Sequence, residues 1–374
     1  MISEYMSKTR LHTFAASIVL IGCASLVHSA EVLSQQISPV SIYFKVDPYW
    51  PKHLPNDWVT GNVGGACVDA NDHVITVNRT ADEGNLSDKE MEVGRAAPPI
   101  IEFDAEGNVV NSWGDVKIVP FGIHDCYVDF EGNIWIGGNR DAIAQKYTHD
   151  GKLLIQIGEK GVFDTDDGTI KGKPNNSSKT RLNRPSSFAV DAANGDVYIT
   201  DGYGNKRVVV FDKNGKYLRQ FGRQATEEET KNGTGGVFTE VVHHVAISKE
   251  GLLYVCDREG RRIQVFDKMG NFKQNLTIPR RRVELPGNGE PYWTVFSRDP
   301  DQKYLIVAGG EDEALWIIER KTGKVLEGFG NMGHLAGEFT FLHSLSTNSK
   351  GDLFIGETNG GRRSQKLKLV NPLP

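Results

Sequence analysis

Four short runs in the middle of the chain decide its fold: Phe188-Ala-Val-Asp191, Gly195-Asp-Val-Tyr-Ile-Thr-Asp201, Arg207-Val-Val-Val-Phe-Asp212 and Gly215-Lys-Tyr-Leu-Arg-Gln-Phe-Gly222. Each run is apolar or alternates apolar with polar residues, and short polar turns containing Gly separate the runs. This pattern is typical of consecutive antiparallel strands joined by tight hairpins, in which Gly supplies the positive φ of the turn. The stretch therefore predicts one unit of four strands.

The same order of runs recurs along the chain. Clear copies occupy residues 126–158 and 245–276, and weaker copies begin near Ala66, Trp293 and Leu345. Six copies over residues 58–370 average about 52 residues each, slightly more than four-stranded propeller blades usually have. Because no crossover helices separate the strands, we predict an all-β, six-bladed β-propeller in a single domain. The alternative is a β-sandwich or two separate β domains.

The two ends of the repeat region predict how the ring closes. We expect Ile42–Val46 to pair with Ser364–Val370 as the outer strand of the last blade, because such a pairing leaves no open sheet edge. Between the strands, only Ala225–Lys231 has a locally helical sequence, and it is short and polar.

Composition excludes several classes of protein. The chain has 374 residues, with 41 Gly, 15 Pro and a net charge of −5. The Gly content exceeds the average of roughly 7% but has no Gly-X-Y period, which excludes collagen. An apolar content of 39% excludes a disordered chain. The acidic balance argues against a nucleic-acid partner, which needs a basic surface.

The first 30 residues have the pattern of a secretory signal peptide. Lys8 and Arg10 precede an apolar run, and small residues follow it. The run is too short for a comfortable transmembrane span, although a signal anchor is the alternative. Leu20-Ile21-Gly22-Cys23 also resembles a lipoprotein signal, in which Cys23 would carry a lipid anchor. We expect a secreted or periplasmic protein, lipid-anchored if Cys23 is modified, in which residues 31–57 form a strap before the propeller.

Three further cysteines would remain after removal of the signal. Cys67, Cys126 and Cys256 each lie inside an apolar, strand-like run. Buried cysteines in such runs behave as small apolar residues. We therefore expect three buried, inert thiols.

Three of the ten histidines share one position in the repeat. His124, His243 and His343 each stand eight residues before the turn Gly of their own blade, in the second, fourth and sixth copies. Alternate blades of a six-bladed ring lie about 120° apart, so three such imidazoles would converge on the central axis. Three His with an open fourth position are typical of catalytic zinc. The alternative is that each is an ordinary hydrogen-bonded His.

The other histidines lack this phase, and we expect surface or local roles for His244, His73, His149, His53 and His334. The blades between the three His place Gly64, Ser186 and the neighbourhood of Trp293 at the same position. Cys126, two residues after His124 on the strand, is a weak additional candidate ligand.

A second set of matched positions follows the second strand of three blades. Arg79, Tyr203 and Arg258 stand where that strand leaves toward the mouth that carries the three His. Two guanidinium groups would attract a carboxylate by bidentate pairing. A phenol close to a metal and an Arg can act as a base or proton relay. The matched Asp201 and Asp257 are expected to brace turns. The alternative is that all are solvated loop residues.

Two of these segments resemble known repeats. Asp201-Gly-Tyr-Gly-Asn-Lys-Arg-Val208 and Asp257-Arg-Glu-Gly-Arg-Arg-Ile-Gln264 resemble NHL-repeat propellers, and residues 58–370 resemble peptidyl-α-hydroxyglycine α-amidating lyase. The resemblance implies an enzyme that releases a peptide amide and glyoxylate. It implies zinc on His124, His243 and His343, with Tyr203 as the catalytic Tyr and Arg79 and Arg258 as the two active-site Arg.

The chain departs from this family at two places. Ser344 follows His343 where the family has an Asp that helps to hold a structural calcium ion, so calcium lacks its expected ligand here. The polar insertion Gly161–Lys179 lies outside the repeat and is expected to shape a different pocket.

Other functions are compatible with the same residues. One alternative is a non-enzymatic NHL propeller that binds a protein or glycan on its channel face. Another is a metal-dependent hydrolase or lyase of some other small carboxylate. For the enzyme we expect a monomer whose partner is a small molecule or peptide that carries a carboxylate, with no nucleic acid and no transmembrane span.

Overall fold

The computed structural model describes residues 37–79, 85–281 and 289–374. The predicted signal peptide, with Cys23, lies outside the described residues, as does the beginning of the predicted strap. Among the described residues, no helix has both the length and the apolar character needed to cross a membrane.

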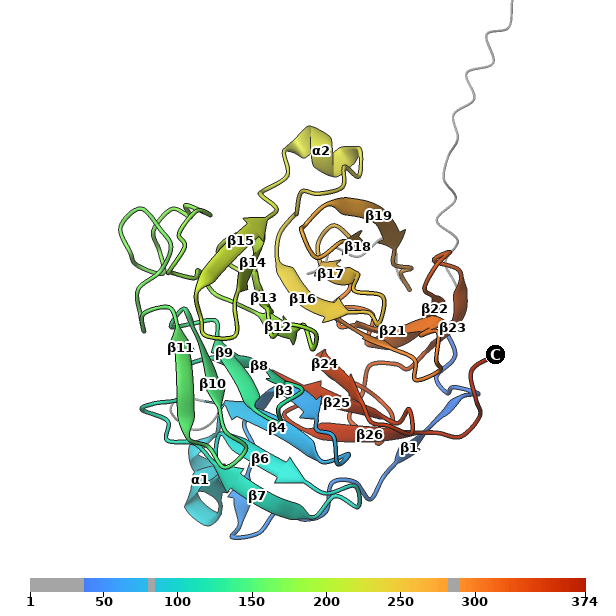
Figure 1. Ribbon diagram of the computed structural model, residues 1–374. Helices are drawn as coiled ribbons and strands as arrows, with labels where there is room; N and C mark the ends of the chain where they lie inside the picture. Colours follow the sequence, from blue (N-terminus) through green and yellow to red (C-terminus); the bar gives the residue numbers. More distant parts are fainter. Residues whose placement is uncertain (1–36, 80–84, 282–288) are drawn as a thin grey trace, which may run out of the picture. The chain divides into compact units, whose positions relative to one another are not determined.

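The strands form six sheets of four strands each, and these sheets are the six blades (Figure 1). Blades one to three contain, in order, β3 (Asn62–Val68), β4 (Val74–Arg79), β6 (Ile100–Phe103) and β7 (Val109–Trp113); β8 (Ile123–Val128), β9 (Ile134–Gly138), β10 (Ile143–Tyr147) and β11 (Leu153–Ile157); and β12 (Ser187–Val190), β13 (Val197–Asp201), β14 (Arg207–Phe211) and β15 (Tyr217–Phe221).

Blades four to six contain β16 (Val242–Ile247), β17 (Leu253–Asp257), β18 (Arg262–Phe266) and β19 (Phe272–Thr277); β20 (Trp293–Phe296), β21 (Tyr304–Gly309), β22 (Ala314–Glu319) and β23 (Val325–Phe329); and β24 (Leu342–Thr347), β25 (Leu353–Glu357), β26 (Ser364–Leu369) and β1 (Phe44–Asp47). Within every blade, neighbouring strands pair antiparallel. The fold is the predicted all-β, six-bladed β-propeller.

The first strands of the blades form a closed ring. β3 contacts β8, β8 contacts β12, and the series continues through β16, β20 and β24 back to β3. Apolar clusters fill the space between neighbouring blades, so both faces of the inner strands are covered. The innermost strands therefore surround the axis on which the predicted histidines were expected to converge.

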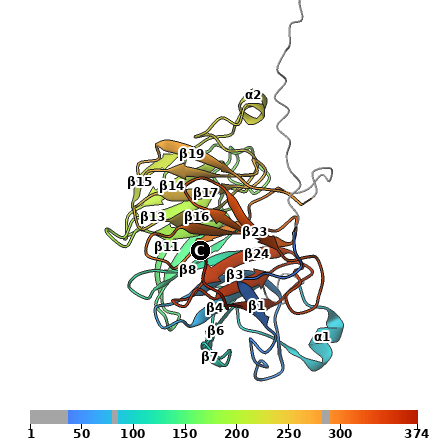
Figure 2. The same cartoon turned by 90° about the vertical axis from the view of Figure 1, so that its right-hand side faces the viewer.

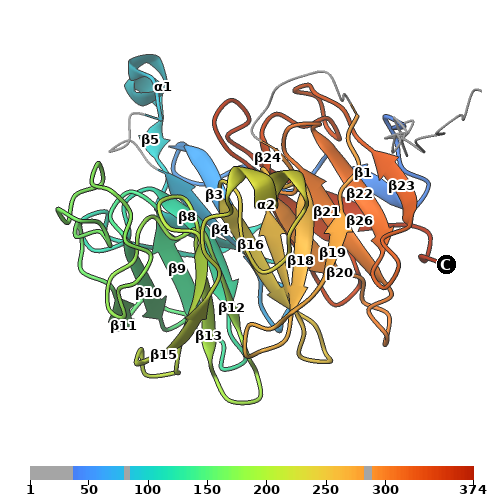
Figure 3. The same ribbon diagram turned by 90° about the horizontal axis from the view of Figure 1, so that it is seen from above.

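The ring closes between the two ends of the chain, as the sequence predicted. β1 pairs antiparallel with β26, with Phe44 opposite Leu369 and Asp47 opposite Lys366. In Figure 3 the blue β1 lies beside the red β26. The Phe44 ring is buried and stacks on Phe329 at a centroid distance of 5.8 Å. The N-terminal segment therefore supplies the outer strand of the last blade.

Two short helices lie outside the blades, α1 (Asp88–Val93) in the connection between β4 and β6 of the first blade and α2 (Glu227–Lys231) between the third and fourth blades (Figure 2). The predicted helical segment contains α2, whereas α1 was not predicted. Both helices begin with a capping box, in which an Ser or Thr side chain and a Glu side chain satisfy each other's backbone N–H groups. A short parallel pair, β2 (Trp58–Val59) with β5 (Arg95–Ala96), holds the α1 connection against the first blade.

The prediction of three inert thiols was wrong for two of the three cysteines. Cys67 of β3 and Cys126 of β8 form a disulfide, with their Cα atoms 5.8 Å apart. The two cysteines are 59 residues apart in sequence but lie on inner strands that contact each other, which only the closed ring reveals. Cys256 is a buried free thiol, and burial raises its pKa well above the usual value.

Candidate metal centre and active site

The three predicted histidines lie together because each stands in a β-bulge. The pairing of β8 with β9 shifts between Ile123 and Asp125, so that His124 is the extra residue. The same shift occurs at His243 in β16 and at His343 in β24. A bulge bends its strand and redirects one side chain. Here it directs the three imidazoles, one from every second blade, toward one another.

The backbones of the intervening blades hold the three rings. Nδ1 of His124 donates to the Ser186 carbonyl at 2.8 Å, and Nδ1 of His343 donates to the Gly64 carbonyl at 2.7 Å. Nδ1 of His243 donates to the Tyr292 carbonyl at 2.7 Å. Gly64 and Ser186 occupy the positions in blades one and three that match the histidines, as the sequence indicated. Because Nδ1 carries the proton, each Nε2 presents a lone pair to the centre.

The three Nε2 lone pairs form a site that fits a metal ion. The three histidines offer ligand atoms within 4.8 Å of one another, and all three side chains are buried. Nε2 of His343 lies 3.2 Å from Nε2 of His124, with no proton available to bridge them. Nε2 of His243 is buried and has no hydrogen-bond partner among the described residues. Converging, unprotonated nitrogens of this kind are the donor set of a three-histidine zinc site.

The surroundings keep these imidazoles neutral. Burial lowers the pKa of His124 and His243 well below the usual value, and it lowers the pKa of His343 to about 3. The positive charges of Arg79 and Arg258 contribute to this low pKa of His343. Neutral imidazole is the form that binds a metal.

Tyr203 and Arg258 lie beside the three rings. The Tyr203 hydroxyl donates to Nε2 of His124 at 3.0 Å, and Nη1 of Arg258 donates to the same hydroxyl at 3.4 Å. Burial alone would lower the pKa of Arg258, but the phenols of Tyr203 and Tyr292 and the Glu259 carboxylate raise it above its usual value. Arg258 therefore stays a cation although its side chain is only 10% exposed.

Arg79 completes the predicted set on the side of the first blade. It ends β4, is half-buried, and its Nε donates to the Ile123 carbonyl at 2.9 Å. This bond fixes the guanidinium next to His124, whose pKa its charge lowers. The structure thus brings all six residues selected from the sequence to one end of the channel.

Two further residues of this centre were not predicted. The guanidinium carbon of Arg184 lies 5.3 Å from the centre of the Tyr203 ring, and the guanidinium carbon of Arg258 lies 5.1 Å from that of Tyr292. Tyr292 occupies the position in blade five that matches the histidines, so counting along the repeat could have found it. Arg184 stands in the loop before β12 at a φ of +66°, and no feature of the repeat marks it.

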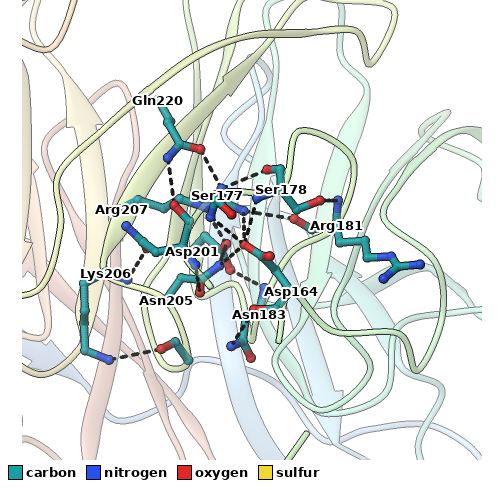
Figure 4. Close-up of polar contacts among 12 residues, drawn as sticks. Asp164, Ser177, Ser178, Arg181, Asn183, Asp201, Asn205, Lys206, Arg207 and Gln220 are labelled. Carbon is teal, nitrogen blue, oxygen red and sulfur yellow. Dashed lines mark hydrogen bonds and ion pairs between the residues drawn. The ribbon is translucent and has the colours of Figure 1, made fainter. Parts of the chain in front are cut away.

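A buried polar network anchors the loop that carries Tyr203 (Figure 4). Arg207 pairs with Asp201 at 2.9 Å and with Asp164 at 3.3 Å, and Asp201 and Arg207 have fully buried side chains. The Asn205 amide donates to both carboxylates, at 2.8 Å and 3.0 Å. Asp201 therefore braces the turn, as predicted. The insertion 161–179 is tied into blade three, because Arg207 also donates to the Ser178 carbonyl at 2.8 Å.

Two minor candidate positions lie outside this set. Cys126 is not a candidate ligand, because its sulfur is bonded to Cys67. The Ser344 hydroxyl is buried and has no hydrogen-bond partner among the described residues.

Fold and repeat define the class of protein. The NHL repeat model matches residues 182–211, which contain β12, β13 and β14. A solved streptogramin B lyase has the same fold, with a TM-score of 0.55 at 12% identity over 87% of this chain and 98% of that one. The chain is therefore a six-bladed β-propeller in which one segment, residues 182–211, matches the NHL repeat.

The proteins with similar sequences fall into two groups, NHL repeat-containing proteins and peptide-amidating enzymes. Human NHL repeat-containing protein 3 is 26% identical over 273 residues, which are 71% of this chain and 67% of that protein. A probable peptidyl-α-hydroxyglycine α-amidating lyase of Caenorhabditis elegans is 26% identical over 327 residues, 81% of each chain. Peptidyl-glycine α-amidating monooxygenase B of Xenopus laevis is 23% identical over 356 residues. The aligned region covers 88% of this chain and 35% of that protein. The chain therefore resembles the amidating lyases.

Proposed function

We propose that the protein is a zinc-dependent lyase that cleaves the N–C bond of a peptidyl-α-hydroxyglycine and releases a peptide amide and glyoxylate. One observation carries the proposal: three neutral, buried imidazoles converge their unprotonated Nε2 atoms beside a Tyr hydroxyl and two arginines. The names of the similar amidating lyases support the choice of substrate.

Zinc bound by His124, His243 and His343 would supply a Lewis acid for the substrate hydroxyl. The side chains of the protein bind the substrate and transfer the proton. Arg258 and Arg79 carry the positive charge that binds and orients the carboxylate of the hydroxyglycine. Their fixed positions, one held by Tyr203 and the other by the Ile123 carbonyl, restrict the orientation of the substrate.

Tyr203 moves the proton. Its oxygen lies between His124 Nε2 and Arg258. With zinc on that nitrogen, the Tyr203 hydroxyl would no longer donate to it and could take the proton of the substrate hydroxyl while passing its own proton toward the leaving nitrogen. When the O–H bond breaks, its electron pair forms the carbonyl of glyoxylate, and the C–N bond pair leaves with the amide nitrogen. That nitrogen then takes up one proton. The reaction needs no oxidant, reductant or second substrate.

The metal and the substrate are tested separately. We expect purified protein to contain zinc at the three-His centre, and His243→Ala to lose that ion. Incubation with an α-hydroxyglycine peptide should release glyoxylate and the amide in equal amounts. Loss of zinc without effect on product release would contradict the mechanism, and zinc binding without glyoxylate release would contradict the substrate. In that second case, α-hydroxy acids and esters would be the next substrates to assay.

A second candidate function follows from the similarity to human NHL repeat-containing protein 3. In this case the propeller would bind a protein or glycan on its channel face without catalysis. It predicts binding that survives chelation of metal and substitution of Tyr203.

The proposed compartment, secreted or periplasmic, is supported by the Cys67–Cys126 disulfide, because structural disulfides persist in oxidising surroundings.

A further inference from the structure

A second group of candidate metal ligands lies between blades one and two, at the end of the strands opposite the three-histidine centre. Asp69 follows the far end of β3, Glu102 lies in β6, and His149 lies in the turn between β10 and β11. Ligand atoms of these three residues all lie within 4.8 Å of one another. Two blades therefore contribute one imidazole and two carboxylates to one point.

The carboxylates of this group are paired with imidazoles. Glu102 is only 4% exposed, and among the described residues its carboxylate pairs with His73 Nδ1 at 2.7 Å and with His149 Nε2 at 2.9 Å. The Glu102 carboxylate raises the pKa of His73. Within the described parts of the chain, neither Glu102 nor Asp69 forms an ion pair with a Lys or Arg. A cation between these two carboxylates, one of them buried, would reduce their mutual repulsion beyond what the pairing with His73 does.

Outer contacts already orient each ligand. Asp69 Oδ1 accepts the backbone N–H groups of Asn71 and His73, at 2.9 Å and 2.8 Å. Glu102 Oε1 takes the contact with His73, which leaves Oε2 directed at His149. Hydrogen bonds of this kind to ligating carboxylates are typical of metal sites. His73 is thus placed to position Glu102.

The spacing and exposure also suit an ion. The 2.9 Å between Glu102 Oε2 and His149 Nε2 is a hydrogen-bond distance, and it is close to the distance of about 3 Å between neighbouring ligand atoms around an octahedral ion with bonds of about 2.1 Å. The His149 side chain is 41% exposed, so an ion and its waters can enter from solvent.

We propose that Asp69, Glu102 and His149 form a second metal site, which takes a divalent first-row transition ion and links blade one to blade two. One nitrogen and two oxygen ligands with open positions for water suit such an ion, and Zn²⁺ is a suitable probe. The proposal does not depend on the lyase activity, because the site uses none of the residues of the three-histidine centre.

The test is the number of zinc ions bound by the full chain after equilibrium dialysis. We expect wild-type protein to bind one ion more than His149→Asn, whose half-exposed position allows the variant to fold. His53→Asn, which removes an exposed His elsewhere, is the matched control and should bind as many ions as wild type. Asp69→Asn is a second variant, for which we expect affinity at this site to fall at least about tenfold.

The difference in the number of bound zinc ions between wild type and His149→Asn tests the proposal whether or not the three-histidine centre binds zinc. If the three-histidine centre binds zinc, the expected counts are two and one; if it does not, they are one and zero. Equal counts in wild type and His149→Asn would overturn the proposal. Equal affinities in wild type and Asp69→Asn would also contradict it.

Discussion

At the scale of single residues, Tyr203 connects the two halves of the candidate active site. Its hydroxyl contacts a candidate zinc ligand, His124, at 3.0 Å and a candidate carboxylate-binding group, Arg258, at 3.4 Å. A second guanidinium, that of Arg184, lies 5.3 Å from the centre of its ring. The phenol therefore lies within reach of a candidate zinc ligand and of two guanidinium groups, where a positioned proton-transferring residue would stand.

Tyr203→Phe removes the hydroxyl and keeps the ring. We expect kcat for glyoxylate release to fall about 10²–10⁴-fold, because that is the usual contribution of a positioned proton-transfer group. KM should change little and the zinc content should stay the same, since the three imidazoles are intact. The measurement is steady-state kinetics with metal analysis. Tyr217→Phe, on the outer strand of the same blade, is the control, and a similar loss of activity in both variants would contradict the assigned role.

From the sequence, only residues that stand at equivalent positions of the repeat could be predicted to lie in this centre. His124, His243 and His343 stand at one position of the repeat, and the structure brings them together. Tyr292 stands at the same position but holds His243 through its backbone carbonyl, a role that no side chain reveals. Arg184 reaches Tyr203 from a connecting loop, and loop geometry does not follow from a repeat pattern.

At the scale of elements, carboxylates hold the loops that lead into the inner strands. Asp201 Oδ1 accepts the Asn183 N–H at 2.6 Å, and Asp257 Oδ1 accepts the Thr239 N–H at 2.9 Å. Glu313 accepts the N–H groups of Phe341 and Leu342, at 2.6 Å and 2.9 Å. Each contact fixes the chain a few residues before a bulge or the start of an inner strand. The carboxylates therefore position the centre without touching it.

Arg207→Met tests the network that anchors the Tyr203 loop. It removes the cation that pairs with Asp201 and Asp164 and leaves two buried carboxylates uncompensated. We expect the free energy of unfolding to fall by about 3–5 kcal/mol in denaturant titrations. Arg223→Met is the control: the pair of Arg223 with Glu229 is exposed and screened by solvent, so its loss should change the free energy of unfolding much less. Equal losses in the two variants would show that the buried network does not stabilise blade three.

Glu313 makes the stability of the fifth and sixth blades depend on pH. Burial raises the pKa of Glu313 from 4.5 to about 7, against the two N–H bonds that lower it. The folded state therefore binds more protons than the unfolded state between these values, and stability falls as pH rises through this window. The expected loss is up to about 3 kcal/mol.

Glu313→Gln removes that titration. We expect the free energy of unfolding of the variant to decline less than that of wild type between pH 4.5 and 7. The measurement is denaturant unfolding across the pH range, with the exposed Glu106→Gln as the control. Parallel curves for wild type and Glu313→Gln would contradict the assignment.

The β-bulges at the three histidines could not be predicted from the sequence. Alternation along a strand places His124 and Cys126 on one face, which made Cys126 a candidate ligand. The bulge at His124 breaks that alternation, and Cys126 instead bonds to Cys67. Bulges depend on pairing with the neighbouring strand, so the spacing within one strand could not reveal them.

At the scale of the whole molecule, the last blade needs the N-terminal segment, because without β1 it would have only three of its four strands. β1 closes the ring in this way, and its main apolar contribution is Phe44, which is 5% exposed and packs in the cluster shared by blades five and six. The centre depends on the same closure, since His343 of blade six donates to the Gly64 carbonyl of blade one.

Phe44→Ala therefore tests whether this strand stabilises the complete ring. We expect the free energy of unfolding to fall by about 3–5 kcal/mol, the usual loss for a buried Phe. Lys45→Ala changes the neighbouring exposed position of β1 and should stay within about 0.5 kcal/mol of wild type. The measurement is equilibrium denaturation followed by Trp fluorescence, together with zinc content. If Phe44→Ala were as stable as Lys45→Ala, the ring would not depend on its N-terminal strand, and the six blades would hold together through the inner strands alone.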